Sequence, residues 1–200
     1  MSRCVYTSFF TPDYLEPAAK LIESLHAHEL DYDIPKVPDT GKWISNCAAK
    51  PKFIYEMLQR YSDRPVVWTD ADSVLKQKPL AFEFEETSAM RGHDAAVCEY
   101  TWRRGRTETL SGTLWFGATD GAKRLADIWA ALQIASPREM DQQVLARAVM
   151  LARAEGIKVA VLPVEYCFIF DLHKLEHPDA KPVFEHFQHS RERKLREVAR

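Results

Sequence analysis

The sequence predicts an α/β fold in which helices cover both faces of a mainly parallel central sheet. Stretches rich in β-branched and aromatic residues alternate with amphipathic stretches of helical period through the first half of the chain. Strand, helix and strand in succession are typical of parallel sheets, because the crossover between parallel strands needs the length of a helix. The 200 residues, 46% of them hydrophobic, fit a single domain over residues 1–200.

The first half of the chain is predicted to contain three strands and two helices. The strands are expected at residues 4–9, 33–37 and 66–70, and the helices at residues 14–28 and 50–61. Leu21 and Leu25 share one apolar stripe in the first helix, as Ile54 and Leu58 do in the second. These helices should therefore pack their apolar faces against the sheet.

The second half is predicted to contain four strands and two helices. The strands are expected at residues 95–100, 113–118, 158–166 and 182–187, and the helices at residues 121–132 and 137–155. The second of these helices opens with Ser136-Pro137-Arg138-Glu139, which has the pattern of a capping box with proline at the first helical position. Gly156 is expected to end it.

Composition excludes several classes of protein. The formal charge is −2 and the mean hydropathy is −0.34, so the whole chain is not a polycation built to coat nucleic acid. No stretch resembles a secretory leader or reaches the length of a membrane span, and we expect a cytoplasmic location. The four cysteines lie far apart and are expected to be buried and reduced. Neither a dinucleotide-binding glycine motif nor a P-loop is present.

The stretch PVVWTDADSVL places Asp70 and Asp72 at the end of an apolar strand. Thirteen aspartates in 200 residues would give about one Asp-x-Asp by chance. A second example, Asp31 and Asp33, follows a helix and is interpreted as a solvated turn. The Asp70–Asp72 pair differs because ligands of open α/β sheets bind beyond the carboxyl ends of strands. Residues i and i+2 of a strand point the same way, so both carboxylates can converge on one Mg²⁺ or Mn²⁺ ion. The alternative is an exposed turn without a metal.

The chain resembles the GT-A-type glycosyltransferases, specifically the small bacterial and phage nucleotide-diphospho-sugar transferases. The resemblance covers nearly the whole chain and follows the family's order: VYTSFFTPDYLEPAAKLIESL, GKWISNCAAKPKFIYEML, VVWTDADSVL, SGTLWFGATDGAKRLADIW, EMDQQVL and PVFEHFQHSRERK. It implies a GT-A-like, Rossmann-like α/β/α sandwich. It also implies transfer of a sugar from a nucleotide-diphosphate donor, with UDP as the expected nucleotide, to a hydroxyl acceptor.

The resemblance also implies roles for individual residues. Asp70, Asp72 and His186 would bind the metal, with His189 as a nearby substitute. The residues expected around the donor nucleotide and sugar are Thr7, Ser8, Tyr14, Lys50, Lys52, Asp70, Ser111, Gly112 and Thr113. Asp141 and Gln142 would lie near the acceptor. A bound Mn²⁺ or Mg²⁺ stabilises the charge that grows on the leaving diphosphate, so no serine–histidine relay is needed. If the reaction inverts the anomeric configuration, Asp141 is the candidate base; an acid in a first helical turn is also favoured by the helix dipole alone.

A phosphotransferase of the haloacid-dehalogenase type is the alternative enzyme, because DADSV also matches its nucleophile motif. Asp70 would then be a covalent nucleophile in a Mg²⁺-dependent reaction. That motif normally closes the first strand of its fold, whereas here a strand and a helix precede it. The later acidic pair of that family is also missing.

Arginines near Trp102 suggest a third interpretation, a site for nucleic acid. WRRGR carries Arg103, Arg104 and Arg106, which could hold phosphates while the aromatic ring stacks on a base. As an acceptor site, this cluster would fit a glycosyltransferase that modifies hydroxylated bases in phage DNA. Glycans and lipid-linked sugars are equally consistent acceptors.

Histidines and tryptophans outside these motifs receive simpler interpretations. His173 and His177 are expected in a solvated turn. Trp43 could stack on a substrate ring.

Overall fold

A computed structural model describes residues 2–83, 90–103 and 105–191. The central sheet has the strand order β2-β1-β3-β6-β5-β7. Its strands are β1 (Val5–Thr7), β2 (Asp31–Asp33), β3 (Val66–Thr69), β5 (Ala95–Thr101), β6 (Thr107–Phe116) and β7 (Val159–Val161). Only β6 runs against its neighbours in this sheet, since β1 is parallel to β2 and β3, and β5 is parallel to β7. The predicted mainly parallel α/β sheet is confirmed.

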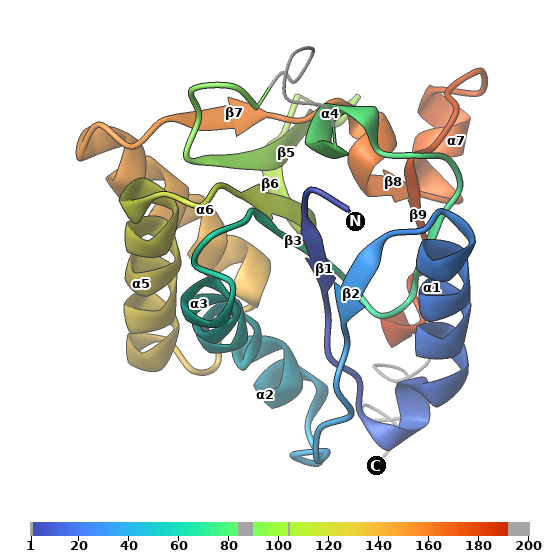
Figure 1. The fold of residues 1–200 in the computed structure, drawn as a ribbon, viewed down its shortest axis with the longest axis horizontal. Coiled ribbons are helices and arrows are strands. Elements are labelled where there is room, and N and C mark those ends of the chain that lie inside the picture. The colour runs from blue at the N-terminus through green and yellow to red at the C-terminus, as the bar shows by residue number, and fades with distance from the viewer. Residues whose placement is uncertain (1, 84–89, 104, 192–200) are drawn as a thin grey trace.

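Helices lie on both faces of this sheet (Figure 1). They are α1 (Leu15–Ala27), α2 (Trp43–Ala48), α3 (Lys50–Arg60), α4 (Leu80–Glu83), α5 (Asp120–Ala135), α6 (Asp141–Ala154) and α7 (Leu172–Glu176), with short 3₁₀ turns at η1 (Pro12–Tyr14) and η2 (Val164–Cys167). In Figure 1, α3, α5 and α6 lie to one side of the strands and α1 lies to the other. The predicted helices are therefore present and sandwich the sheet as expected.

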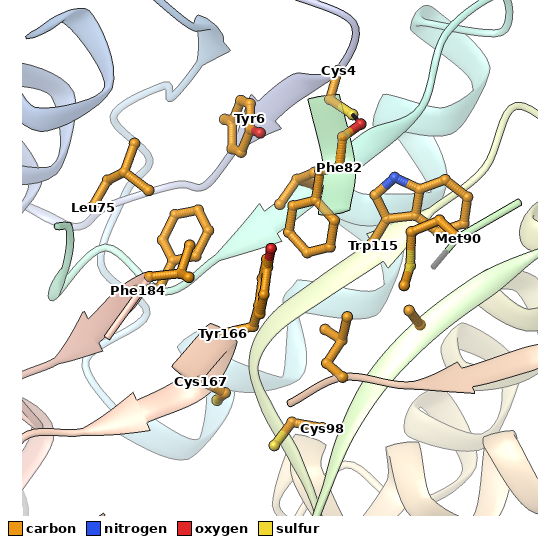
Figure 2. Packing of buried hydrophobic residues seen from close by; sticks show 14 of the residues in the cluster. Cys4, Tyr6, Leu75, Phe82, Met90, Cys98, Trp115, Tyr166, Cys167 and Phe184 are labelled. Atoms are coloured by element: carbon orange, nitrogen blue, oxygen red, sulfur yellow. Dashed lines mark hydrogen bonds between the residues drawn. The ribbon is translucent and has the colours of Figure 1, made fainter. Parts of the chain in front are cut away.

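Two buried clusters, one on each face, hold these layers together. Val67 of β3 belongs to the first core, whereas its neighbours Val66 and Trp68 belong to the second, because successive strand side chains point to opposite faces. The first core includes Tyr6 and Phe184, and Figure 2 shows their rings beside other aromatic side chains. Each large apolar side chain buried in this way contributes roughly 1.5–3 kcal/mol.

A second, three-stranded sheet brings the C-terminal part of the chain to the end of β3. Its order is β4-β9-β8, with β4 (Ser73–Leu75), β8 (Phe168–Ile169) and β9 (Phe184–His186). The predicted last strand is thus present, although it pairs outside the central sheet. Its register sets His186 opposite Ser73, the residue after Asp72.

The interpretation of Asp31 and Asp33 as a solvated turn was wrong. Both residues lie in β2, which begins two residues before the strand predicted at 33–37 and overlaps it only at Asp33. β2 is an edge strand, where a polar strand is tolerated. Arg64 pairs with Asp31, and Arg60 pairs with Asp33, so the charges are balanced in the strand.

Three other local predictions were also wrong. Ser136 ends α5 instead of capping the next helix, and α6 begins at Asp141, because α5 continues through Ala135. The strand predicted at 158–166 stops at Val161 and gives way to η2. His173 is fully buried, where its Nδ1 accepts a hydrogen bond from the Ile169 amide at 3.0 Å, so it does not lie in a solvated turn.

Two expectations about the whole chain can be compared with the structure. Cys4, Cys98 and Cys167 are buried free thiols, as expected, whereas the free thiol Cys47 is only partly buried, contrary to the expectation. Within the ranges that the structure describes, no helix combines the length and the apolar character needed to cross a membrane.

Candidate active site

A cleft lies beyond the carboxyl ends of β1 and β3, where ligands of open α/β sheets bind. Segments from both halves of the chain form its walls. They contribute Phe9, Phe10, Thr11, Tyr14, Trp43, Asn46, Cys47, Lys50, Trp68, Asp70, Ala71, Asp72, Ser111, Met140, Asp141, Gln142, Gln188 and Ser190. Aromatic rings, carboxylates and one lysine therefore face the same space.

The turn between β3 and β4 is fixed by backbone hydrogen bonds from two directions. The Asp70 amide donates to the Gly112 carbonyl at 2.8 Å, which ties the turn to β6. The Phe187 amide donates to the Asp72 carbonyl at 3.0 Å, and the His189 amide donates to Asp72 Oδ2 at 2.7 Å. These contacts hold both aspartates in place without using all of their carboxylate oxygens.

Asp70, Asp72 and His186 form the Asp-Asp-His cluster, in which one ligand atom from each residue lies within 4.8 Å of the others. Gly112 makes room for the histidine, because a Cβ at that position would stand 2.9 Å from His186 Cε1. The His186 Nε2 atom shares a hydrogen bond of 2.9 Å with Thr113 Oγ1, which fixes the ring. Burial lowers the pKa of His186 to about 4, so the ring is neutral at pH 7 and keeps a nitrogen lone pair.

These donors fit a divalent cation. Carboxylate and imidazole are ligands that Mn²⁺ accepts, and carboxylates also suit Mg²⁺. Burial raises the pKa of Asp70 and of Asp72, and for Asp72 the neighbouring Asp70 charge is the next cause. A cation bound between the two carboxylates would remove that repulsion.

Lys50 connects the cluster to the opposite wall of the cleft. Its Nζ atom lies 2.9 Å from Asp70 Oδ1 and 2.7 Å from Asp141 Oδ2, and its side chain is only 6% exposed. Ser111 completes the network, because its hydroxyl donates to Asp141 Oδ2 at 2.9 Å. Burial alone would lower the pKa of Lys50, but the Asp141 and Asp70 carboxylates outweigh it and raise that pKa. Lys50 is therefore a fixed cation between two acids.

Comparison with known proteins identifies the family of the chain. Residues 17–197 match the nucleotide-diphospho-sugar transferase family. The chain belongs to this family. It is thus a glycosyltransferase, as the sequence resemblance implied, and the phosphotransferase alternative has no support.

Solved structures of glycosyltransferases share the fold of this transferase. One is a glycosyltransferase involved in the glycosylation of the major capsid of PBCV-1, with a TM-score of 0.70 and 14% identity over 93% of each chain. Another is GlyE of Streptococcus pneumoniae TIGR4, with a TM-score of 0.62 and 15% identity. That match covers 94% of this chain but 54% of GlyE, so the transferase spans about half of that protein's length. No curated protein matches the chain by sequence.

The structure brings some of the predicted site residues of the transferase to the cleft, whereas others lie elsewhere. Those that line it are Tyr14, Lys50, Asp70, Asp72, Ser111, Asp141 and Gln142, with His186 in the Asp-Asp-His cluster. His189, the predicted substitute ligand, packs its ring edge-on against Tyr14, with the ring centroids 5.0 Å apart. Burial, with Asp72 as the next cause, raises the pKa of Tyr14.

Other predicted donor-site residues do not line the cleft. Thr7, Ser8 and Thr113 are fully buried, and Gly112 acts through the space it leaves for His186. Lys52 is 77% exposed, lies within 3.8 Å of Glu56 and borders a separate apolar groove.

The arginines predicted to bind the acceptor are engaged elsewhere. Arg103 donates to the Leu175 carbonyl at 3.1 Å, and Arg106 lies 3.0 Å from Glu108. Arg104 lies outside the described residues. Gln142 reaches the cleft, and its Nε2 donates to Glu108 at 3.3 Å.

Some cleft residues were missed by sequence reasoning. Trp68 precedes Asp70 by two residues, and strand alternation could have placed both side chains on one face. Gln188 has a left-handed backbone, φ 55°, for which its residue type gives no signal.

Proposed function

We propose that this transferase moves a sugar from UDP-sugar to a hydroxyl acceptor, with Mn²⁺ or Mg²⁺ held by Asp70, Asp72 and His186. The Asp-Asp-His cluster beside the cleft is the observation that supports this proposal most directly. When bound, the cation would stabilise the negative charge of the leaving diphosphate.

The charges of the site support a divalent ion. Asp70, Asp72 and Asp141 carry three negative charges when ionised and Lys50 carries one positive charge, which leaves −2. Two positive charges would neutralise this group, whereas an unpaired buried charge costs several kcal/mol. Lys50 thus reduces the charge of the site to what one such ion can balance.

The aromatic wall of the cleft supports a nucleotide donor. Phe9, Phe10 and Tyr14 line the side that follows β1, where a base could pack against rings. Thr7 and Ser8 would support this wall from behind, and Asp70 would contact the ribose or the ion's water shell. The assignment of uridine rests on the family resemblance.

Asp141 and Gln142 are the residues that we propose to face the reacting sugar and the acceptor. Lys50 and Ser111 both contact Asp141 Oδ2, so Oδ1 would accept the proton of an acceptor hydroxyl if the reaction inverts. Ser111 would contact the donor sugar from the opposite wall.

For the acceptor, we propose a hydroxyl group on a glycan or lipid-linked sugar in preference to a base in DNA. Arg103 and Arg106 are already paired with Glu176 and Glu108, at 3.7 and 3.0 Å, which weakens their attraction for phosphates. Hydroxymethylated DNA remains a useful test acceptor, because glycosylation of it would overturn this preference.

The donor site is tested by calorimetric titration with UDP, with and without Mn²⁺, on the wild type and on Asp72→Ala. We expect UDP binding that depends on Mn²⁺ in the wild type and is lost in Asp72→Ala. Asp33→Ala, which changes an aspartate at the other Asp-x-Asp, should bind like the wild type. Manganese-independent binding, or binding that survives in Asp72→Ala, would overturn the assignment of the metal ligands.

A panel of nucleotide sugars then tests the reaction. We expect slow release of UDP from one UDP-sugar without acceptor and faster release with the correct hydroxyl acceptor. If another nucleotide binds in a manganese-dependent way and UDP does not, the metal site stands and the assignment of uridine is wrong.

A further inference from the structure

Trp68 lies one residue before the end of β3 and contacts Asp70 of the Asp-Asp-His cluster. Its side chain is almost fully buried, with 2% of the residue exposed, yet its edge reaches the wall of the cleft. The indole Nε1 donates a hydrogen bond of 3.0 Å to Asp70 Oδ1. Lys50 Nζ approaches the same oxygen at 2.9 Å. Asp70 Oδ1 therefore has two donors, which leaves Oδ2 for a cation.

The position of Trp68 in the strand explains this contact. Residues i and i+2 of an extended chain project to the same side, so the indole of Trp68 and the carboxylate of Asp70 share one face of the sheet. An indole N–H can only donate, and a carboxylate accepts through both oxygens. The hydrogen bond thus fixes which oxygen of Asp70 turns toward the protein.

The indole ring is itself held firmly. Its centroid lies 5.4 Å from that of Phe9 and 5.9 Å from that of Phe53, and these two phenylalanine rings lie 5.3 Å apart. On another side, Lys50 Nζ lies 5.3 Å from the centre of the Trp68 ring, within reach of a cation–π interaction. A side chain packed on several sides in this way has little freedom to turn its N–H elsewhere.

We propose that Trp68 is a positioning residue for metal binding, which orients Asp70 so that Oδ2 faces Asp72 and His186. This inference rests on the proposed function, because it assumes that the Asp-Asp-His cluster binds the cation. Partners that orient a metal ligand typically contribute 10- to 100-fold to metal affinity. Lys50 shares the task with Trp68, so we expect the lower end, about tenfold.

The test removes the N–H and keeps the shape of the side chain. Trp68 is replaced, by site-specific incorporation, with benzothienylalanine, in which sulfur takes the place of the indole N–H. Mn²⁺ binding is measured by electron paramagnetic resonance of the free ion, without nucleotide. We expect Mn²⁺ to bind about tenfold more weakly than to the wild type.

Kinetics separate positioning from a general loss of structure. The apparent KM for Mn²⁺ should rise by about the same factor, while kcat at saturating Mn²⁺ stays within about twofold of the wild type. Trp68→Phe, a variant made with an ordinary residue, should show the same rise. The control is benzothienylalanine at Trp115, which lies in the first core on the other face of the sheet (Figure 2) and should leave Mn²⁺ affinity unchanged.

The possible results lead to different conclusions. If the wild type binds Mn²⁺ and the Trp68 variant binds it equally well, the positioning role is wrong and the proposed function stands. A fall in kcat at saturating Mn²⁺, with unchanged Mn²⁺ affinity, also overturns the positioning role. If the wild type binds neither Mn²⁺ nor Mg²⁺, both the proposed metal site and the proposed role of Trp68 are wrong.

Discussion

The chain contains two Asp-x-Asp pairs on one sheet, one within β2 and one just after β3, and they have different surroundings. Asp31 and Asp33 lie in the edge strand β2, where each carboxylate has its own arginine at 2.7 Å. Asp70 and Asp72 follow the buried strand β3, where they converge with His186 and border the cleft.

The two pairs differ in how much of their carboxylate charge is balanced by neighbouring cations. At β2 the carboxylates meet separate cations supplied by nearby side chains, so no shared site is formed. At β3 the single lysine contacts Asp70 and Asp141, while Asp72 receives a backbone amide. Asp70 and Asp72 thus have the features that a metal site needs, namely charges that are not fully paired and a third potential ligand, and among the described residues Asp31 and Asp33 lack them.

Removing the cation beside each pair should give the largest contrast in stability. Lys50→Met leaves the buried Asp141 and the partly exposed Asp70 without their partner, and we expect the free energy of unfolding to fall by about 3 kcal/mol. Arg60→Met removes the partner of Asp33 at a site where the arginine is 58% exposed, and the loss should be a small fraction of that. Urea unfolding of both variants measures the difference.

The double variant Lys50→Met with Asp141→Asn checks the cause. It should recover part of the lost stability, because it removes one of the two carboxylates that are left unpaired. Equal losses in Lys50→Met and Arg60→Met would show that burial does not distinguish the two pairs.

The space left by Gly112 should be essential only to the Asp70–Asp72 pair. In Gly112→Ala the new Cβ would stand 2.9 Å from His186 Cε1, so the ring must move away from its position in the cluster. We expect Mn²⁺ to bind at least tenfold more weakly. Calorimetric titration measures this affinity, and wild-type affinity in Gly112→Ala would mean that His186 is not a ligand.

His186, the histidine next to Asp70 and Asp72, should make the free energy of unfolding depend on pH in the acid range. Burial lowers the pKa of His186 to about 4, from an ordinary value of 6.5. Between these pH values the unfolded chain binds a proton at this residue and the folded chain does not. The free energy of unfolding therefore falls as pH drops from 6.5 to 4, by at most about 1.4 kcal/mol per pH unit from this residue.

The variant His186→Gln isolates that contribution. Its unfolding free energy, measured in urea across the same pH range without metal, should change less steeply than that of the wild type. An identical slope would mean that the histidine titrates in the folded protein as it does in the unfolded chain.

The smallest effect is expected from Asp33→Asn. The amide keeps a hydrogen-bond acceptor for the Tyr61 hydroxyl, which lies 2.9 Å from Asp33 Oδ2, and loses only the charge that faces Arg60. We expect a slightly lower Tm, with the affinity for UDP and kcat unchanged. A loss of UDP binding in Asp33→Asn would contradict this, because it would show that the β2 pair takes part in donor binding.

The helices and strands that were predicted correctly are those that a local pattern of apolar residues specifies. The stripes through Leu21 and Ile54 predicted α1 and α3, and the apolar run that ends at Asp70 predicted β3. The family resemblance added His186, which no local pattern connects with a strand more than a hundred residues earlier. The cytoplasmic location stays a prediction.

Features that depend on pairing between distant segments were harder to predict. The start of α6 was misplaced because α5 continues to Ala135, and Gln133 Nε2 then donates to the Ser136 and Glu139 carbonyls in the turn that follows. The pairing of Arg103 with Glu176, for example, joins the β5–β6 hairpin to α7, so no local pattern could show it. Gln188 reaches the cleft through a backbone conformation that its side chain does not favour.

If His186 is a metal ligand, as we propose, the pairing of β9 with β4 also sets the earliest time at which the enzyme can become active. Asp70 and Asp72 leave the ribosome early in synthesis, whereas His186 is added more than a hundred residues later. Domains can begin to fold while they are still being made. A nascent chain that stops before residue 186 can form much of the central sheet but holds two of the three proposed ligands. Sugar transfer by this protein would therefore begin only after β9 has been translated and has docked.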